Sequence, residues 1–257
     1  MSAGGPEGTL RAPVRLSVVL PTWNEQDGIL TTLDAVAESA GELVAAGEVE
    51  SVQVVVVDDG STDGTPELLA QRSSADPALV VVTHPANRGL GAGVRSGLAA
   101  STGDVVLYTD ADLPFDLVEV AKALRIMRQR DVAMLALYRH DRTGEGVRRF
   151  VFSYAYNLLV RTVLGVRVRD VNFAGKFLRR DLVDSVELHS EGSFVDAELV
   201  AKAERAGFGV AQFGVDYFPR SRGVSTLSST PVVLRIFREM RALLPEVRAV
   251  GPRPELR

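Results

Sequence analysis

The stretch VQVVVVDDGS, residues 52–61, joins a near-continuous valine run to two carboxylates and a glycine. An unbroken run of β-branched residues is typical of a parallel strand that is buried on both faces. Gly60 permits a tight turn directly after the run, and Ser61 or Thr62 can cap a helix that follows. The stretch therefore predicts a buried strand that leads through a polar turn into a helix.

The same alternation of strands and helices continues on both sides of this stretch. Alternating elements imply βαβ units, so we predict a single-domain α/β fold with a mostly parallel, twisted sheet and flanking helices. Strands are expected at 16–20, 52–57, 79–82, 105–109, 132–138 and 210–218. Helices are expected at 25–47, 63–71, 89–100, 115–129, 150–164, 194–206 and 231–244.

Composition sets limits on the domain and its location. With 257 residues and 46% hydrophobic content, the chain is long enough for one substantial core. Residues 1–13 are rich in Gly and Pro and predict a disordered leader, followed by a main domain at 14–228 and an amphipathic helix with a flexible tail at 229–257. No signal peptide and no apolar run of about 18 residues is present, so we expect a cytoplasmic protein that is not secreted and has no transmembrane helix.

Residue usage excludes several classes of site. The chain has no Cys, which excludes disulfides and thiolate metal sites, and its three His lack the HExxH spacing of a zinc hydrolase. Residues 1–120 carry 5 Lys and Arg against 18 Asp and Glu, whereas residues 121–257 carry 24 against 15. A genome that prefers Arg explains part of this bias, but an Arg-rich half also suits phosphates, acidic lipids or nucleic acid. Acidic clusters at the strand ends would repel a polyanion, so we expect no nucleic acid partner.

Three polar clusters follow three of the predicted strands: PTWNE at 21–25, DDGS at 58–61 and DAD at 110–112. Ligands bind where the carboxyl ends of parallel strands meet, so we expect the clusters to form one site. Asp110 and Asp112 are spaced i, i+2 and point to the same side of an extended segment, which suits Mg²⁺ or Mn²⁺. Alternatively, Asp112 caps a helix that begins near Pro114, and DDGS is a plain turn of capping residues.

The glycine-rich segment NRGLGAG, residues 87–93, raises the question of dinucleotide binding. Its glycines are outside the GxGxxG register, and it follows the third predicted strand rather than the first. We therefore interpret it as a set of small residues that allow a helix to pack closely against the sheet.

Together these motifs resemble family 2 glycosyltransferases of the GT-A fold, and especially the dolichyl- and polyprenyl-phosphate sugar (mannose or glucose) synthases. The resemblance covers about residues 14–228 and rests on VVLPTWNE at 18–25, VVVDDGSTD at 55–63, NRGLGAG at 87–93 and DAD at 110–112. Three further stretches support it, at 148–159, 169–177 and 219–226.

The resemblance implies inverting transfer of a hexose from a nucleotide sugar, GDP-mannose or UDP-glucose, to a polyprenyl phosphate at a membrane surface. The residues implied to contact the donor are Pro21, Trp23, Glu25, Val57, Asp59, Asp110, Ala111 and Asp112. Asp59 would reach the base or ribose, and Asp110 and Asp112 would hold Mg²⁺ or Mn²⁺ beside the diphosphate. Asp112, Arg139 and Arg220 would act in catalysis by neutralising the leaving nucleoside diphosphate. The residues implied to meet the acceptor phosphate are Arg148, Lys176, Arg222 and Ser225.

Two positions depart from the mannose-phosphate-dolichol type. Pro114 stands two residues after Asp112, where that type has Gln, and Thr226 stands where it has Lys. A polyprenyl phosphate is itself an anionic nucleophile, so its attack would need positioning and desolvation rather than a general base.

The segment FVDAEL, residues 194–199, leaves the acceptor open. Asp196 and Glu198 match a D-x-E-L pattern similar to that of dolichyl-phosphate glucose synthases. Asp196 also falls where family 2 enzymes that glycosylate a hydroxyl place a catalytic base. An acidic pair favoured by the helix dipole is the structural alternative. A third hypothesis, suggested by Pro114 and Thr226, is a nucleotide-sugar-binding partner protein without catalysis.

Helices 150–164 and 231–244 have two interpretations. They lie in a membrane interface with Arg near anionic headgroups, which predicts a peripheral protein on the inner face of the plasma membrane, or they pack on the core. We interpret His84 and His189 as structural. The sequence leaves the oligomeric state open, with a homodimer as one option.

Overall fold

A computed structural model describes residues 10–140, 147–217 and 230–253, without the side chains of 147–153 and 230–234. The strands are β1 (Val14–Thr22), β2 (Val49–Asp58), β3 (Leu79–Thr83), β4 (Val105–Thr109), β5 (Met134–Arg139), β6 (Gly175–Arg179) and β7 (Val210–Val215). The helices are α1 (Ile29–Ala45), α2 (Thr65–Ala75), α3 (Leu90–Ala100), α4 (Glu119–Arg130), α5 (Val147–Leu164), α6 (Arg180–Ser185), α7 (Val195–Arg205) and α8 (Thr230–Ala249). Within these residues, no helix combines the length and apolar character needed to cross a bilayer.

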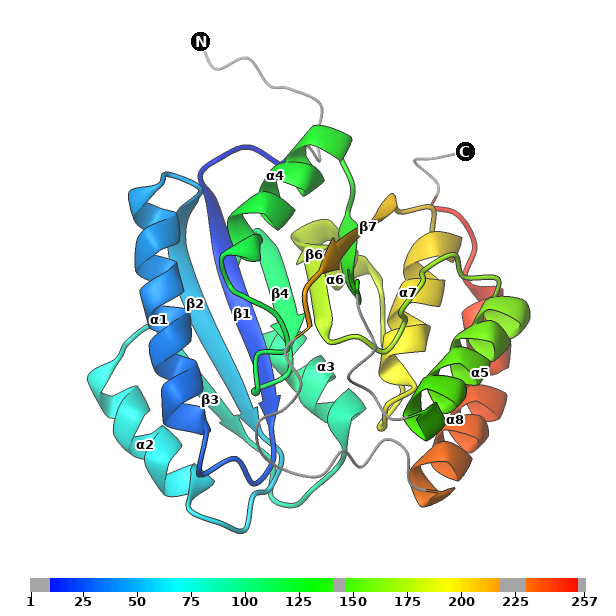
Figure 1. Cartoon of the computed structure of the whole chain (residues 1–257), viewed down its shortest axis with the longest axis horizontal. Helices are drawn as coiled ribbons and strands as arrows, with labels where there is room; N and C mark the ends of the chain where they lie inside the picture. Colours follow the sequence, from blue (N-terminus) through cyan, green and yellow to red (C-terminus); the bar gives the residue numbers. More distant parts are fainter. Residues whose placement is uncertain (1–9, 141–146, 218–229, 254–257) are drawn as a thin grey trace.

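The strands form one sheet in the order β3-β2-β1-β4-β6-β5-β7 (Figure 1). Every neighbouring pair is parallel except the two that involve β6, which runs antiparallel to β4 and to β5. The carboxyl ends of β1, β2 and β4 therefore lie at the same edge, and Thr22 is paired with Asp58 there. This arrangement confirms the predicted α/β fold with a mostly parallel sheet.

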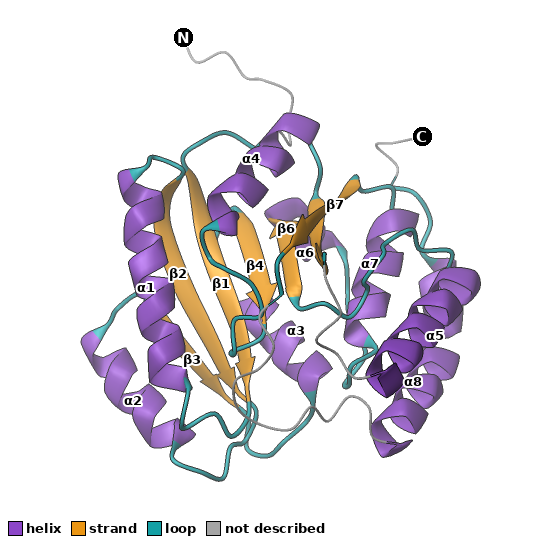
Figure 2. Cartoon of the chain, in the orientation of Figure 1, coloured by secondary structure: helices purple, strands orange, loops and turns teal. Residues whose placement is uncertain are grey.

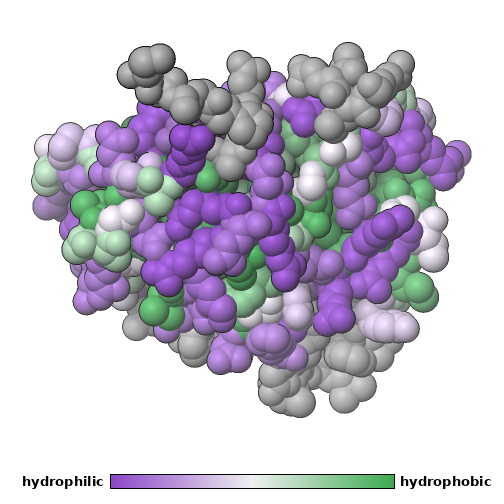
Figure 3. All heavy atoms as spheres, turned by 90° about the horizontal axis from the view of Figure 1, so that it is seen from above, coloured by the Kyte–Doolittle hydropathy of each residue, from purple (hydrophilic) through white to green (hydrophobic). Residues whose placement is uncertain are grey.

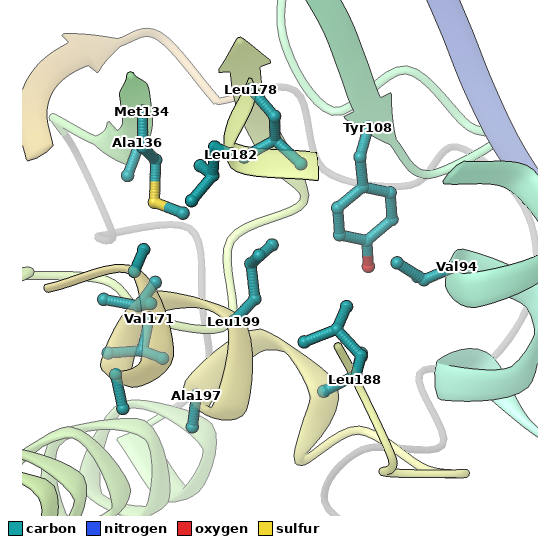
Figure 4. Close-up of a cluster of buried hydrophobic side chains, with 14 of the residues drawn as sticks. Val94, Tyr108, Met134, Ala136, Val171, Leu178, Leu182, Leu188, Ala197 and Leu199 are labelled. Carbon is teal, nitrogen blue, oxygen red and sulfur yellow. The ribbon is translucent and has the colours of Figure 1, made fainter. Parts of the chain in front are cut away.

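Helices cover both faces of the sheet (Figure 2). Side chains of a strand alternate between the faces, so Val54 and Val56 pack in one cluster with α1, α2 and α4, whereas Val55 and Val57 pack in a second cluster on the other face. This second cluster includes residues of α3 and of α5 to α8 and is shown in part in Figure 4. Burial on both faces explains why the valine run has no polar alternation.

The edge of the sheet opposite the carboxyl ends is viewed in Figure 3, where hydrophilic side chains are interspersed with smaller apolar areas. This edge holds the exposed ion pair of Arg15 with Asp104, whose atoms Nη2 and Oδ1 are 2.6 Å apart. This pair lies at the opposite edge of the sheet from the three polar clusters.

The short helix α6 was not predicted, and three further differences from the sequence prediction have a physical reason. β6 was not predicted because Lys176 is fully buried there, and a lysine breaks the apolar pattern of a buried strand. α4 begins at Glu119 rather than at residue 115, so the alternative role of Asp112 as a helix cap is wrong. α8 continues beyond Pro245 to Ala249, although proline disfavours a helix interior, because Val247 is fully buried in the core.

Candidate active site

The loop after β1 is fastened to the loop after β2. Asn24 Oδ1 accepts a hydrogen bond from Thr62 N at 2.8 Å, and Asn24 N donates to Ser61 Oγ at 2.9 Å. Asn24 has a φ of 54°, which asparagine tolerates better than most residues. These bonds fix the positions of Trp23, which is 48% exposed, and of half-buried Glu25. An aromatic face and a carboxylate therefore stand on a rigid loop at the carboxyl edge.

Asp59 is held by three groups of the protein. Its Oδ1 lies 2.6 Å from His84 Nδ1 and accepts from Arg88 N at 3.0 Å, and its Oδ2 accepts from Gly89 N at 2.7 Å. The residue is only 5% exposed. Asp59 therefore fixes the turn that precedes α3, and the base or ribose contact predicted for it would have to compete with these bonds.

The neighbouring Asp58 has an oxygen that the described protein does not satisfy. Asp58 Oδ1 accepts from Ser61 N at 3.0 Å, but within the described residues its buried Oδ2 has no hydrogen-bond partner. An unsatisfied buried acceptor costs about 1–3 kcal/mol, which a ligand N–H or O–H would recover. No role of Asp58 was predicted from the sequence. The alternation of side chains along a strand was the available signal, because it places Asp58 and Asp59 on opposite sides.

The main chains of β1, β2 and α3 approach closely beside these loops. Val57, which was predicted to contact the donor, is fully buried and is paired with Pro21 of β1. A Cβ atom added to Gly93 would lie 3.1 Å from Pro21 Cβ. This tight contact confirms that the glycine-rich segment serves close packing of a helix on the sheet.

The turn at 110–112 follows β4 and is anchored on both sides. Leu113 N donates to the carbonyl oxygen of Asp110 at 3.1 Å, and Thr32 Oγ1 of α1 donates to that of Ala111 at 2.6 Å. Asp110 and Asp112 are half-buried on this turn. No group of three or more acidic or His side chains suited to a metal occurs in the part of the chain that the structure describes. Two carboxylates fit Mg²⁺ or Mn²⁺ when phosphate oxygens complete the coordination.

Arg139, at the end of β5, is held by the carboxylate of Asp170, which was not predicted as a site residue. Its Nε and Nη2 donate to the two oxygens of Asp170 at 2.8 and 3.1 Å. The guanidinium also lies 5.2 Å from the ring centre of Tyr217 and 5.7 Å from that of Phe173. Because Asp170 is 1% exposed, this fork fixes a cation beside the turn that leads into β6.

Lys176 and Asp196, which were predicted to meet the acceptor phosphate and to act in catalysis, bond each other in the core. Lys176 Nζ lies 2.5 Å from Asp196 Oδ1 and donates to Phe173 O at 2.9 Å. Lys176 is 0% exposed and Asp196 is 2% exposed. Burial raises the pKa of the Asp196 carboxyl, and the ammonium of Lys176 opposes that rise. The pair joins β6 to α7 without reaching the surface.

Glu198, the second acid of the D-x-E-L pattern, holds the segment that precedes α7. Its Oε1 accepts from His189 N at 2.9 Å and from Lys202 Nζ at 2.7 Å, and its Oε2 accepts from Ser190 N at 2.8 Å. The residue is fully buried. This geometry favours the structural interpretation of Glu198.

Four predicted residues lack a described side chain. Arg220, Arg222 and Ser225 lie outside the described residues, as does the departure at Thr226. Arg148 lies in α5, but its side chain is outside the described part.

Comparison with known proteins places these features in a family. Residues 17–186 match the model for glycosyl transferase family 2. Glycosyltransferase AglD of Haloferax volcanii is 33% identical over 84% of this chain, although the match spans only 35% of that protein. Polyprenol monophosphomannose synthase of Mycolicibacterium smegmatis is 28% identical, with 92% of this chain and 89% of that protein covered.

A solved structure agrees with this assignment. Glucosyl-3-phosphoglycerate synthase from Mycobacterium tuberculosis, in complex with Mn²⁺, uridine diphosphate and glucosyl-3-phosphoglycerate, has a TM-score of 0.63 and 25% identity. The match covers 88% of this chain and 80% of that chain. The family match, the relatives and the sheet with its acidic carboxyl edge confirm the resemblance seen in the sequence. This chain belongs to glycosyl transferase family 2 and is a glycosyltransferase with the GT-A fold.

Proposed function

We propose that the protein transfers a hexose from GDP-mannose or UDP-glucose to a polyprenyl phosphate, with inversion at the anomeric carbon. The observation that carries this choice of acceptor is the buried ion pair of Lys176 with Asp196. A hydroxyl acceptor needs a base, but Asp196 is 2% exposed and bonded to an ammonium group. A phosphate acceptor is already anionic and needs only positioning. The similarity to polyprenol monophosphomannose synthase supports the same class of acceptor.

The donor would lie across the three polar clusters. Its base or ribose would donate to Asp58 Oδ2, and its diphosphate would share Mg²⁺ or Mn²⁺ with Asp110 and Asp112. When bound, the ion would neutralise charge on the leaving nucleoside diphosphate, assisted by Arg139 and Arg220. The Mn²⁺ and uridine diphosphate of the related structure support a divalent ion here.

The acceptor would approach from the half of the molecule that holds α5 and α8. Because Lys176 is engaged by Asp196, the acceptor phosphate would meet the polar side chains at Arg148, Arg222 and Ser225.

The lipid part of the acceptor would bring these helices to a membrane surface. Tyr154 and Leu158 on α5 are 63% and 51% exposed, and Phe237 on α8 is 46% exposed. Arg238 and Arg241 are exposed beside Phe237 and suit anionic headgroups. Ile236 and Met240 of α8 pack on the core. The two interpretations of this helix thus apply to its two faces, and we propose a peripheral protein on the inner face of the plasma membrane.

A transfer assay tests the function. The protein is incubated with Mn²⁺ and radiolabelled GDP-mannose or UDP-glucose, with and without polyprenyl phosphate, and label is counted in the extracted lipid phase. We expect label in that phase only when polyprenyl phosphate is present. Label that enters only water-soluble products would favour a hydroxyl acceptor. Donor binding without transfer to either acceptor would favour a non-catalytic partner protein.

A further inference from the structure

Three segments that are far apart in the sequence meet beside Asp59. They are the start of α3, the turn at 190–192 before α7, and the first half of α8. Glu191 stands at the centre of this junction, because its Oε1 accepts from Arg95 Nη2 at 2.5 Å and from Arg88 Nη2 at 3.3 Å. Its carbonyl oxygen accepts from Gly91 N at 2.9 Å. Glu191 therefore bonds the start of α3 through both its side chain and its main chain.

The fit between this turn and α3 leaves no room for larger residues. A Cβ atom at Gly89 would lie 2.6 Å from Glu191 O, and one at Gly91 would overlap Ser190 O. Gly89 also has a φ of 103°, which favours glycine. The main chain at Arg88 and Gly89 is therefore placed by the turn against which it rests.

The same two residues hold Asp59 from the other side. Arg88 N and Gly89 N both donate to the Asp59 carboxylate. Asp59 adjoins Asp58, whose Oδ2 is the unsatisfied acceptor at the edge of the sheet. A shift of the 88–89 turn would thus be transmitted to Asp59 through these two hydrogen bonds, and along the main chain to its neighbour Asp58.

α8 fastens the junction from its remaining side. Arg235 Nη2 donates to Arg88 O at 3.3 Å, and Arg235 Nε donates to Glu239 Oε1 at 3.1 Å. Ser190 Oγ in turn donates to Glu239 Oε2 at 2.9 Å. The 88–89 turn is therefore bonded to both the 190–192 turn and α8.

We propose that Glu191 is a positioning residue for donor binding, which sets the Arg88–Gly89 turn and through it the carboxylates of Asp58 and Asp59. This inference rests on the proposed function, which puts the donor nucleotide at that cluster. The Arg88–Gly89 turn bonds Asp59 directly, so the effect of Glu191 is expected at the nucleotide end of the donor.

The test is Glu191→Gln, which keeps the size of the side chain and removes its charge. Asp104→Asn is the matched control, because Asp104 has a similar exposed fraction of its side chain, 41% against 43%, and also pairs with an arginine. Donor and acceptor KM values are measured, with calorimetric Kd values for GDP and UDP and the midpoint of thermal unfolding.

We expect Glu191→Gln to raise the donor KM and the nucleotide Kd about 3- to 10-fold, because the amide keeps the acceptor oxygen but loses the charge that strengthens its bonds to Arg88 and Arg95. The acceptor KM should stay within about twofold, and Asp104→Asn should change none of these constants. Arg95→Lys, which keeps the charge but loses the fork to Ser190 O and Glu191, should act in the same direction. An unchanged donor KM in Glu191→Gln would overturn the positioning role alone. A wild-type protein that binds neither nucleotide would overturn the proposed function as well.

Discussion

In the half of the sheet formed by β3, β2, β1 and β4, carboxylates at the strand ends accept hydrogen bonds from main-chain N–H groups. In the half formed by β6, β5 and β7, acids pair instead with Lys or Arg in the core. Asp58 exemplifies the first half, since it accepts from Ser61 N, and Asp196 exemplifies the second. Main-chain donors hold a carboxylate without cancelling its charge, whereas the buried pair of Lys176 with Asp196 leaves neither charge available to a ligand. The difference suggests that acids of the first half serve ligand recognition and that those of the second serve stability.

The sharpest test of this contrast is Asp112→Asn. Loss of a ligand for the metal and diphosphate should lower kcat/KM by about 1000-fold or more, equivalent to about 4 kcal/mol of activation free energy. The midpoint of thermal unfolding should change little, because the turn is anchored by Thr32 and by main-chain bonds. Asp116→Asn is the control, since Asp116 lies on the same segment and its carboxylate accepts from Val118 N. Full activity in Asp112→Asn would remove the metal role.

Lys176→Met should act mainly on stability, in contrast to Asp112→Asn. It leaves the Asp196 carboxyl buried without its ammonium, which should lower the free energy of unfolding by about 3 kcal/mol or more. The double change Lys176→Met with Asp196→Leu should recover much of this loss. Arg15→Met breaks an exposed pair and should cost less than about 1 kcal/mol. Urea denaturation measures all three, and equal costs for Lys176→Met and Arg15→Met would contradict the contrast.

The contact of His189 with Glu246 of α8 should add to the free energy of unfolding by an amount that depends on pH. Glu187 and Glu246 raise the pKa of His189, whose Nε2 lies 3.1 Å and whose Nδ1 lies 2.5 Å from their carboxylates. A raised histidine pKa adds stability that is fully present below its ordinary pKa of about 6.5 and is lost as pH rises through the folded value. The difference in free energy of unfolding between wild type and His189→Gln should therefore be larger at about pH 6 than at about pH 9. If the free energies of unfolding of the two proteins changed in parallel with pH, the raised pKa of His189 would be contradicted.

Tyr108→Phe changes a residue of β4, where the two halves of the sheet meet. Of these substitutions it should have the smallest effect on stability. The Tyr108 ring is fully buried, its hydroxyl has no hydrogen-bond partner among the described residues, and burial raises its pKa. In Figure 4 the oxygen lies among apolar side chains, with Val94 and Leu188 beside it. Removing it should leave the free energy of unfolding unchanged or raise it by up to about 1 kcal/mol. A loss larger than that in urea denaturation would indicate that the hydroxyl has a partner.

Much of the first half could be predicted because its signals are local. The valine run, Gly60 and the acids at 58–61 and 110–112 each indicate a strand, a turn or a polar end within a few residues of sequence. The order of these parts along the chain then places them on one edge of a parallel sheet. Whether Asp58 or Asp59 keeps an unsatisfied oxygen was harder to predict, because it depends on which side of the strand faces the turn at Arg88.

The charged residues of the second half could not be predicted in the same way, because their partners are distant in the sequence. Lys176 and Asp196 are 20 positions apart, and Arg139 and Asp170 are 31 apart. Each of these residues alone resembles a surface charge or a ligand, and only the folded chain identifies its partner. Lys176 also interrupts the apolar pattern of β6. The ion pair of Lys176 with Asp196 therefore explains why β6 was not predicted and why two residues that were predicted for the site lie in the core.

The position of β6 in the sheet also bears on how the protein is made. β5 precedes β6 along the chain, but in the described sheet its neighbours are β6 and β7. During synthesis, β1 to β4 can assemble as soon as residue 109 has left the ribosome, whereas β5 waits without a neighbour until residues 175–179 emerge. Throughout that interval β5 and the free edge of β4 are open to wrong partners. The nascent chain should therefore be most prone to aggregation while α5 is being translated.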